Sequence, residues 1–183
     1  MKTEQILNVL RVAAWVAFFS SIISLVFIVV VMSIDLTNGL LFGYDTKTIV
    51  NVSGIDLSTK ELRTNYLKEF ICLISFGAAL GLIHVQIWWK VKEILTKINV
   101  TNPFSVKIAL LLERVAYLLL LIWILSLIGG GYTQWLSNKV AHTAFHLKFN
   151  MEFSYLFSAG IVYIVSQVYK RGAELQEEIN YTI

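Results

Sequence analysis

Four long apolar blocks constrain this chain more than any other feature of its sequence. They run from Val12 to Ile34, from Phe70 to Trp89, from Val115 to about Gly131 and from Phe153 to Tyr169. A membrane-spanning helix needs about 20 mostly apolar residues, and each block comes near that length. Apolar residues are continuous within each block rather than alternating, which indicates helices and not barrel strands. The sequence therefore predicts an all-α integral membrane four-helix bundle with short interfacial and cytosolic helical extensions.

Composition agrees with this prediction. Of the 183 residues, 57% are hydrophobic, against about 45–50% in a typical soluble domain. Four spans leave no room for a separately folded domain, so we expect one membrane domain over residues 1–183. The net charge of +3 is small and no basic stripe appears, which argues against direct nucleic-acid binding. Cys72 is the only cysteine, which excludes an internal disulfide.

The lysines and arginines indicate how the spans are oriented. If the N-terminus is inside, the inner segments contain nine of these residues and the outer segments six. Lys90 and the pair Lys170–Arg171 directly follow their spans, which strengthens the bias. We therefore expect a multi-pass protein of the bacterial cytoplasmic (inner) membrane with both termini cytosolic. Aromatic residues near several span ends fit anchoring at the lipid headgroups: Trp88, Trp89, Tyr132, Trp135 and Tyr169.

The connecting segments differ in character. In this orientation residues 35–69 and 132–152 are outer segments, 90–114 is a cytosolic connection and 170–183 is a cytosolic tail. The cytosolic connection contains Thr101-Asn102-Pro103, an N-cap candidate followed by the only proline at a first helical position. It therefore predicts a break between two helical extensions.

The first outer segment contains two local signals. Thr48–Val52 has the composition of a short strand. Ser58-Thr59-Lys60-Glu61 has capping-box spacing, which predicts a helix that runs into the second span.

Polar residues inside the spans are few. No charged residue lies at the centre of a span, where each would cost about 2.5–3.5 kcal/mol. This absence weighs against a proton-coupled transporter or an ion pump. His84, Gln86 and Gln167 lie within about two helical turns of the cytosolic span ends. Two interpretations stay open: these side chains form hydrogen bonds across helices or at the interface, or they line a small inward-facing polar cavity.

Two further pairs of residues are candidate sites. His142 and His146 share one face of an expected outer interfacial helix and have metal-binding spacing. The alternative is the polar face of that helix, and we expect no bound metal or other cofactor. Glu113–Arg114 adjoins the cytosolic end of the third span, where it would bind a partner or lipid headgroup, or simply anchor the helix.

The spans contain small residues but no catalytic pattern. Gly77 and Gly81 form a G-x-x-x-G pattern typical of close helix packing. The single serines have no histidine and carboxylate partners in a triad pattern. Phosphate-loop and dinucleotide-binding motifs are also missing from the sequence. We therefore do not expect an enzyme.

The C-terminal tail reads KRGAELQEEINYTI. Leu175, Ile179 and Ile183 recur every four residues and give an apolar stripe. Such a tail docks on its own cytosolic connection or on a partner, or else it emerges as a fraying helix whose acids are repelled by the headgroups. The candidate partner-binding residues lie in this tail or at the third span: Glu113, Arg114, Lys170, Arg171, Gly172, Glu174, Glu177 and Glu178.

Three stretches of the chain resemble a known family. They are KINVTNPFS at Lys97–Ser105, LLERVAY at Leu111–Tyr117 and the whole of Phe157–Ile183. The chain resembles the four-span bacterial membrane family called domain of unknown function 2975, in its Bacteroidetes-like form. Asn180 departs from the pattern, since many members have an acid there. The resemblance implies a four-span fold, and a gene often placed beside a small helix-turn-helix regulator.

These observations favour one function and leave an alternative. The leading hypothesis is a non-enzymatic membrane partner or sensor that acts with a cytosolic regulator, which the resemblance implies is a helix-turn-helix protein. The alternative is a small transporter or an immunity-type membrane protein with a polar cavity near His84, Gln86 and Gln167. The sequence contains no signal for an oligomeric state.

Overall fold

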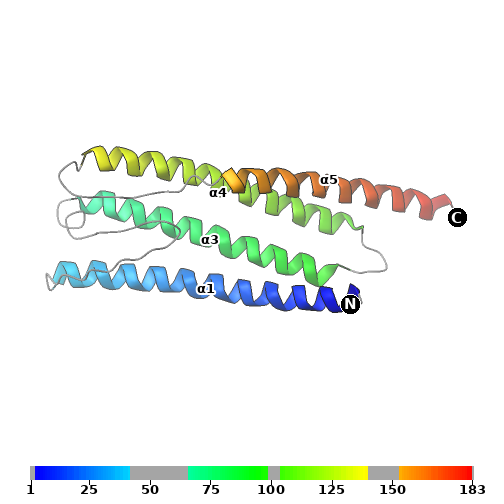
Figure 1. Ribbon diagram of the computed structural model, residues 1–183, viewed down its shortest axis with the longest axis horizontal. Helices are drawn as coiled ribbons and strands as arrows, with labels where there is room; N and C mark the ends of the chain where they lie inside the picture. Colours follow the sequence, from blue (N-terminus) through cyan, green and yellow to red (C-terminus); the bar gives the residue numbers. More distant parts are fainter. Residues whose placement is uncertain (1–2, 42–65, 99–103, 140–152, 183) are drawn as a thin grey trace. The chain divides into compact units, whose positions relative to one another are not determined.

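The fold is all-α, as predicted. The computed structural model describes residues 3–41, 66–98, 104–139 and 153–182, and these contain helices and no strand. The four helices, labelled as in Figure 1, are α1 (Thr3–Leu41), α3 (Leu67–Lys97), α4 (Val106–Lys139) and α5 (Phe153–Thr182). The expected strand at Thr48–Val52, the helix start at Ser58 and the histidines His142 and His146 lie outside the described residues.

Three of the described helices are long and apolar enough to cross a membrane. The segments are Gln5–Val30, Leu67–Lys97 and Val106–Leu136. Each overlaps a predicted span. Large apolar side chains on these helices are exposed, for example Val12 (63%) and Ile23 (67%), as expected for helices surrounded by lipid. α5 is not among the three, so the fourth span remains a prediction.

The helices extend beyond the apolar blocks. α1 continues past Asp35 to Leu41, and α3 continues past Lys90 to Lys97. In α3 the residues after the apolar block include Lys92, Glu93 and Leu95, which are good helix formers, so the end of the block does not end this helix. Within α3, the carboxylate of Glu93 pairs with Lys90 at 2.9 Å and with Lys97 at 2.6 Å, at spacings that support a helix.

α4 begins at Val106. The predicted N-cap and first helical residue at Thr101-Asn102-Pro103 lie outside the described residues. The carbonyl oxygen of Ser105 accepts a hydrogen bond from the amide of Ala109 at 3.1 Å, which makes Ser105 the N-cap residue. Serine is as good an N-cap residue as asparagine, so the sequence offered two competing starts close together.

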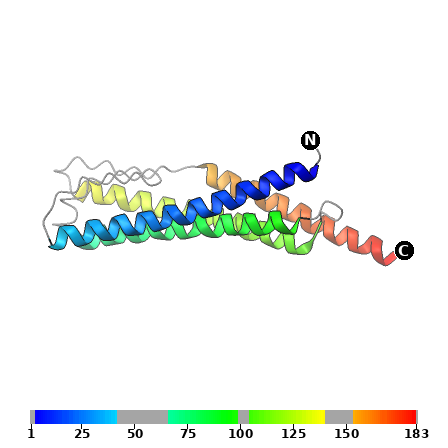
Figure 2. The same ribbon diagram turned by 90° about the horizontal axis from the view of Figure 1, so that it is seen from below.

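The described helices fall into two compact units. Unit 1 comprises Met1–Ile22, Ile83–Ile122 and Phe153–Ile183, whereas unit 2 comprises Ile23–Leu82 and Trp123–Glu152. In unit 1 the start of α1 and the last turns of α5 lie toward the end where α3 finishes and α4 begins (Figures 1 and 2). The core of unit 1 is built on Ile94, Ile108, Leu111 and Val115, against which Val162 and Tyr169 of α5 pack.

Among the described residues of unit 2, the helices meet at a close contact of Gly81, at the stacked rings of Phe76 and Tyr132, and at an ion pair. A side chain at Gly81 of α3 would meet the Leu25 side chain of α1 at 2.7 Å, whereas Gly77 has open space around it. Only Gly81 of the predicted G-x-x-x-G pattern therefore lies at a close contact. Lys139 pairs with Glu69 at 2.9 Å, joining the end of α4 to the start of α3.

Candidate functional site

A groove lies between the first turn of α4 and the tail of α5, both in unit 1. Its volume is about 490 Å³. It is lined by residues from both segments: Phe104, Ser105, Val106, Lys107, Ala173, Gln176 and Glu177. Apolar, cationic and anionic side chains therefore share one surface. In the predicted orientation this surface faces the cytosol.

Close packing of α5 against Phe104 forms the floor of the groove. The rings of Phe104 and Tyr169 are 5.3 Å apart. A Cβ atom at Gly172 would lie 2.7 Å from Cδ1 of Phe104, so glycine allows the ring to approach the helix backbone. Ala173 is buried beside it. The start of the tail thus packs on Phe104, in the connection between α3 and α4, as one interpretation of its sequence expects.

Leu175 is the residue of the apolar stripe whose side chain the structure describes. Leu175 is 51% exposed. Phe104 itself is 41% exposed, although Gly172 and Tyr169 contact one side of its ring. Exposed apolar surface therefore remains at Phe104 in the groove and at Leu175 on the tail, outside the groove lining.

Charged residues surround the groove. Arg171 donates to the Glu174 carboxylate at 2.8 Å, a pair that is largely exposed. Lys107 and Glu177, which line the groove, are exposed, as are Lys170 and Glu178 beside it. Six of the eight predicted partner-binding residues, those from Lys170 to Glu178, therefore lie on the tail that builds this surface.

The other two predicted residues lie elsewhere. Glu113 accepts a hydrogen bond from the hydroxyl of Tyr117 at 3.0 Å, one turn further along α4. Arg114 is exposed. Neither residue lines the groove, so the structure does not bring the Glu113–Arg114 pair and the tail residues into one site.

Arg11 of α1 caps the end of α3. Its Nε donates to the carbonyl oxygen of Leu95 at 2.9 Å, and one terminal nitrogen donates to that of Ile98 at 3.4 Å. The last carbonyls of a helix lack partners within the helix and sit at its negative end. The guanidinium therefore satisfies these carbonyls and fixes the start of α1 beside the end of α3.

Lys92 lies within a cluster of aromatic rings. Its ammonium nitrogen is 4.2 Å from the ring centroid of Trp15, 4.7 Å from that of Phe18 and 5.0 Å from that of Trp89. Phe18 and Trp89 also meet edge to face, at 5.8 Å between centroids. An ammonium over aromatic faces is stabilised electrostatically. This aromatic cluster is a second link between α1 and α3 in unit 1.

The polar residues predicted to share a cavity are not brought together. The ring of His84 on α3 lies 3.4 Å from the hydroxyl of Tyr155 on α5. Gln86 is exposed, and two residues apart on a helix point to different sides. Gln167 donates to the buried hydroxyl of Ser166 at 3.4 Å. His84 thus makes an interhelical hydrogen bond, as one of the two interpretations expected.

Sequence reasoning missed several contact residues. Arg11, Lys92, Phe104 and Tyr155 make the contacts described above, and none was a candidate. Phe104 had a local signal, since it follows the predicted break directly. The others interact with residues far away in the chain, a relation that the spacing of one sequence does not reveal.

Metal binding finds no support in the part of the chain that the structure describes. Within residues 3–41, 66–98, 104–139 and 153–182, no three histidine, cysteine or acidic side chains gather closely enough to hold a metal ion. The predicted pair His142 and His146 lies outside these ranges.

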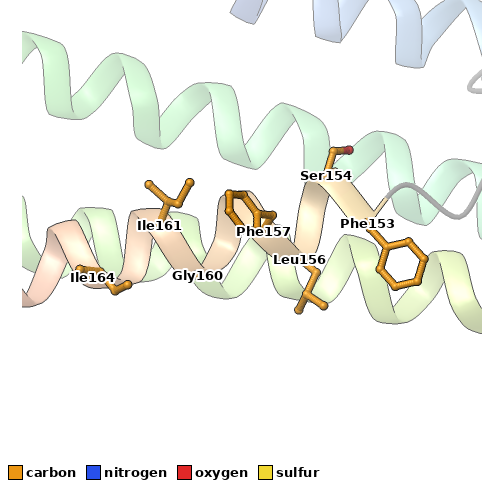
Figure 3. A pocket seen from close by; sticks show the side chains of 7 residues that line it. All are labelled: Phe153, Ser154, Leu156, Phe157, Gly160, Ile161 and Ile164. Carbon is orange, nitrogen blue, oxygen red and sulfur yellow. The ribbon is translucent and has the colours of Figure 1, made fainter.

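A second hollow lies along one face of α5 (Figure 3). Its volume is about 660 Å³. All the lining residues belong to α5, and Ser154 is the one with a polar side chain. They are Phe153, Ser154, Leu156, Phe157, Gly160, Ile161 and Ile164. This apolar face suits hydrocarbon chains and offers almost nothing to a polar ligand.

A comparison with family models identifies the chain's relatives. The model described as protein of unknown function (DUF2975) matches residues 52–183. The chain belongs to this DUF2975 family. The match takes in α3, α4 and α5 and confirms the resemblance seen in the sequence, whereas α1 lies before it. No curated protein and no solved structure matches the chain.

Two contacts join α1, which lies outside the DUF2975 match, to α3, which lies inside it. Arg11 and Trp15 precede the matched residues, while their partners Leu95 and Lys92 lie within them. In this member of the DUF2975 family, the end of α3 therefore contacts a helix that lies outside the matched residues.

Proposed function

We propose that this protein is a non-enzymatic membrane protein that binds a cytosolic protein through the groove between α4 and α5. The observation behind this proposal is the groove itself, where Phe104 and Lys107 at the start of α4 and Glu177 on the tail of α5 are exposed. Apolar anchors beside charged groups are typical of protein–protein contacts. The tail lies on the cytosolic side if both termini are inside the cell.

The proposed partner is a small helix-turn-helix regulator. Support comes from the resemblance to the family, whose genes are often placed beside such a regulator. In this proposal the membrane protein holds the regulator at the bacterial inner membrane. The regulator, and not this chain, would then contact DNA. The net charge of this chain is only +3, which agrees with the absence of direct DNA binding from the proposal.

Two adjacent acids on the tail provide a matched test. Glu177 lines the groove, whereas Glu178 does not. In this proposal a cation of the regulator contacts Glu177, so Glu177→Arg creates a like-charge contact. We expect this substitution to weaken co-purification with the regulator at least about tenfold, which corresponds to about 1.4 kcal/mol. Glu178→Arg should change it less than about twofold. Removal of residues 172–183 should abolish it.

The controls separate binding from insertion. Every variant should be recovered from the membrane fraction at the wild-type level before binding is compared. An inserted protein that retains the regulator without residues 172–183 would contradict the proposal. A C-terminal reporter that is active only in the periplasm would also contradict it, because the tail would then face the wrong side.

One observation supports the alternative function, a small transporter or an immunity-type protein. The hydrogen bond between His84 and Tyr155 places polar atoms between two largely apolar helices. Polar groups at such positions often lie along a transport path. If the alternative is correct, His84→Leu should abolish transport or protection, while Gln86→Leu, at an exposed position, should preserve it.

A further inference from the structure

We propose that α5 enters only half of the bilayer. Its first part, from Phe153 to about Tyr163, lies in the hydrocarbon of the leaflet nearest Lys90, which is the cytosolic leaflet in the predicted orientation. The remainder lies in the headgroups and the cytosol. The hollow apolar face of α5 then holds acyl chains of this one leaflet. Contacts with α4 and α3, all within unit 1, independently set this depth.

The contact with α4 places Tyr163 at the membrane boundary. The rings of Tyr117 and Tyr163 are 6.2 Å apart. Tyr117 follows Glu113 by one turn, and its hydroxyl donates to the Glu113 carboxylate at 3.0 Å. Because the charges of Glu113 and Arg114 end the apolar block of α4, the Tyr117 ring lies at the edge of the hydrocarbon. Tyr163 lies at the same level.

The contact with α3 gives the same result. His84 precedes Lys90 by six residues, which places it about 9 Å inside the boundary. Its partner Tyr155 precedes Tyr163 by eight residues, a distance of about 12 Å along α5. The two helices therefore locate Tyr155 at depths that agree within about 3 Å.

The depth of Phe153 follows from this register. Phe153 precedes Tyr163 by ten residues, or about 15 Å of helix, and the hydrocarbon is about 30 Å thick. α5 thus reaches about the midplane. A complete span from Phe153 to Tyr169 would instead place the boundary at Tyr169. That ring packs on Phe104, outside the apolar block of α4, and on the cluster around Ile94, among the charges of α3.

Two further observations fit a half-inserted helix. α5 is not among the described helices long and apolar enough to cross a membrane. Backbone groups at the start of a helix need polar partners, and irregular backbone at membrane depth is tolerated where protein or water supplies them. The hydroxyls of Ser154 and Tyr155 and the ring of His84 provide polar atoms at this depth.

The hollow apolar face of α5 fits lipid acyl chains. Phe157 is 74% exposed and Ile164 is 64% exposed, and the open space at Gly160 lies between them along the helix (Figure 3). Such a surface is stable in hydrocarbon and unfavourable in water. Because the face runs from the midplane to the boundary, it matches the chains of a single leaflet.

A depth profile distinguishes half-insertion from a complete span. In a Cys72→Ser background, single cysteines replace exposed residues of α5 in the full chain. The positions are Phe153, Phe157, Ile161, Ile164 and Val168. Each carries a spin label, and collision with oxygen and with a water-soluble nickel complex measures its depth in liposomes of phosphatidylethanolamine and phosphatidylglycerol.

We expect the label at position 153 to be deepest, with depth falling steadily to a water-exposed label at 168. A maximum near Ile161, with both ends shallow, would establish a complete span and overturn the proposal. Uniformly water-exposed labels would overturn it as well. Labels on α1 at Val12, Val16, Phe19, Ile23 and Phe27 are the control and should be deepest near the middle of that series.

A second measurement needs no substitution. A lipid-soluble carbene reagent is activated in liposomes that hold the wild-type protein, and the modified residues are identified by mass spectrometry. Half-insertion predicts modification from Phe153 to about Tyr163 and at least tenfold less at Val168. Equal modification of Phe157 and Val168 would overturn the proposal even if the labelled variants do not insert.

Discussion

The ammonium nitrogen of Lys92 lies 4.2 Å from the ring centroid of Trp15 and 5.0 Å from that of Trp89. Trp15 belongs to α1 and Trp89 to α3, so the lysine links the two helices. Tryptophans near a span end also anchor a helix at the headgroups. One cluster therefore both joins two helices and sets their depth.

Removal of the Lys92 charge should weaken this link. Lys92→Met keeps most of the side-chain length but loses a cation–π interaction of about 0.5–2 kcal/mol. We expect a lower unfolding temperature in micelles and a shift in tryptophan emission. Lys97→Met is the control, because Lys97 pairs with Glu93 on the exposed side of α3 and such pairs contribute little. Identical emission from both variants would show that the rings do not sense the Lys92 charge.

Loss of the Arg11 cap should loosen the end of α3. Arg11→Gln removes charge-assisted hydrogen bonds to the carbonyls of Leu95 and Ile98, each worth about 1.5–3 kcal/mol. Amide hydrogen exchange at residues 94–98 should therefore accelerate about tenfold. Asn8→Ala removes only an exposed contact to Arg11 and should leave this exchange nearly unchanged. Equal exchange in wild type and Arg11→Gln would exclude the cap.

Two glycines of α5 should respond differently to alanine. Gly160 has open space around it, so Gly160→Ala should stabilise the helix by about 0.5–1 kcal/mol. Gly172→Ala places a methyl group against the Phe104 ring, and the ring must then move. This cost should cancel the stabilisation that alanine otherwise gives a helix. Thermal unfolding followed by circular dichroism measures both. In a Phe104→Ala background the difference should vanish, and its persistence would argue against the contact.

The two glycines of α3 provide a similar comparison in unit 2. Gly81→Leu forces a large side chain against Leu25 and should destabilise the protein by about 1–3 kcal/mol. Gly77→Leu, where the structure leaves open space, should cost far less. Unfolding in mixed detergent micelles measures the difference. Leu25→Ala should restore most of the stability of Gly81→Leu, and an absence of rescue would mean that another neighbour is responsible.

The apolar blocks predicted which parts of the chain are helical, because lipid demands continuous hydrogen-bonded apolar helices. The blocks alone did not predict where the helices end, although residues 90–114 predicted a helical extension on each side of a break. Lys90, Lys92 and Glu93 end the apolar block of α3 but favour helix, so α3 continues to Lys97. Pro103 indicated the break before α4, yet Ser105 competed for the N-cap position and determined the start.

The site was predicted in part. The composition of the tail identified Glu177 and Gly172, since charge and a glycine after a span are visible in one sequence. Phe104, which completes the groove, lies far from the tail in the chain and only folding brings it there. His84 and Tyr155 are also far apart in the chain. A tyrosine within an apolar block does not reveal its contact partner, so Tyr155 was not predicted.

The cap formed by Arg11 also has a consequence for synthesis. Arg11 is separated from Leu95 by 84 residues and from Ile98 by 87. At about 5–20 residues per second, the ribosome needs roughly 4–17 s to make that length of chain. If the N-terminus is inside, as the sequence predicts, the positive charge of Arg11 would favour that orientation of α1 before α3 is made. In that orientation one guanidinium would act first on the insertion of α1 and then on the end of a helix made seconds later.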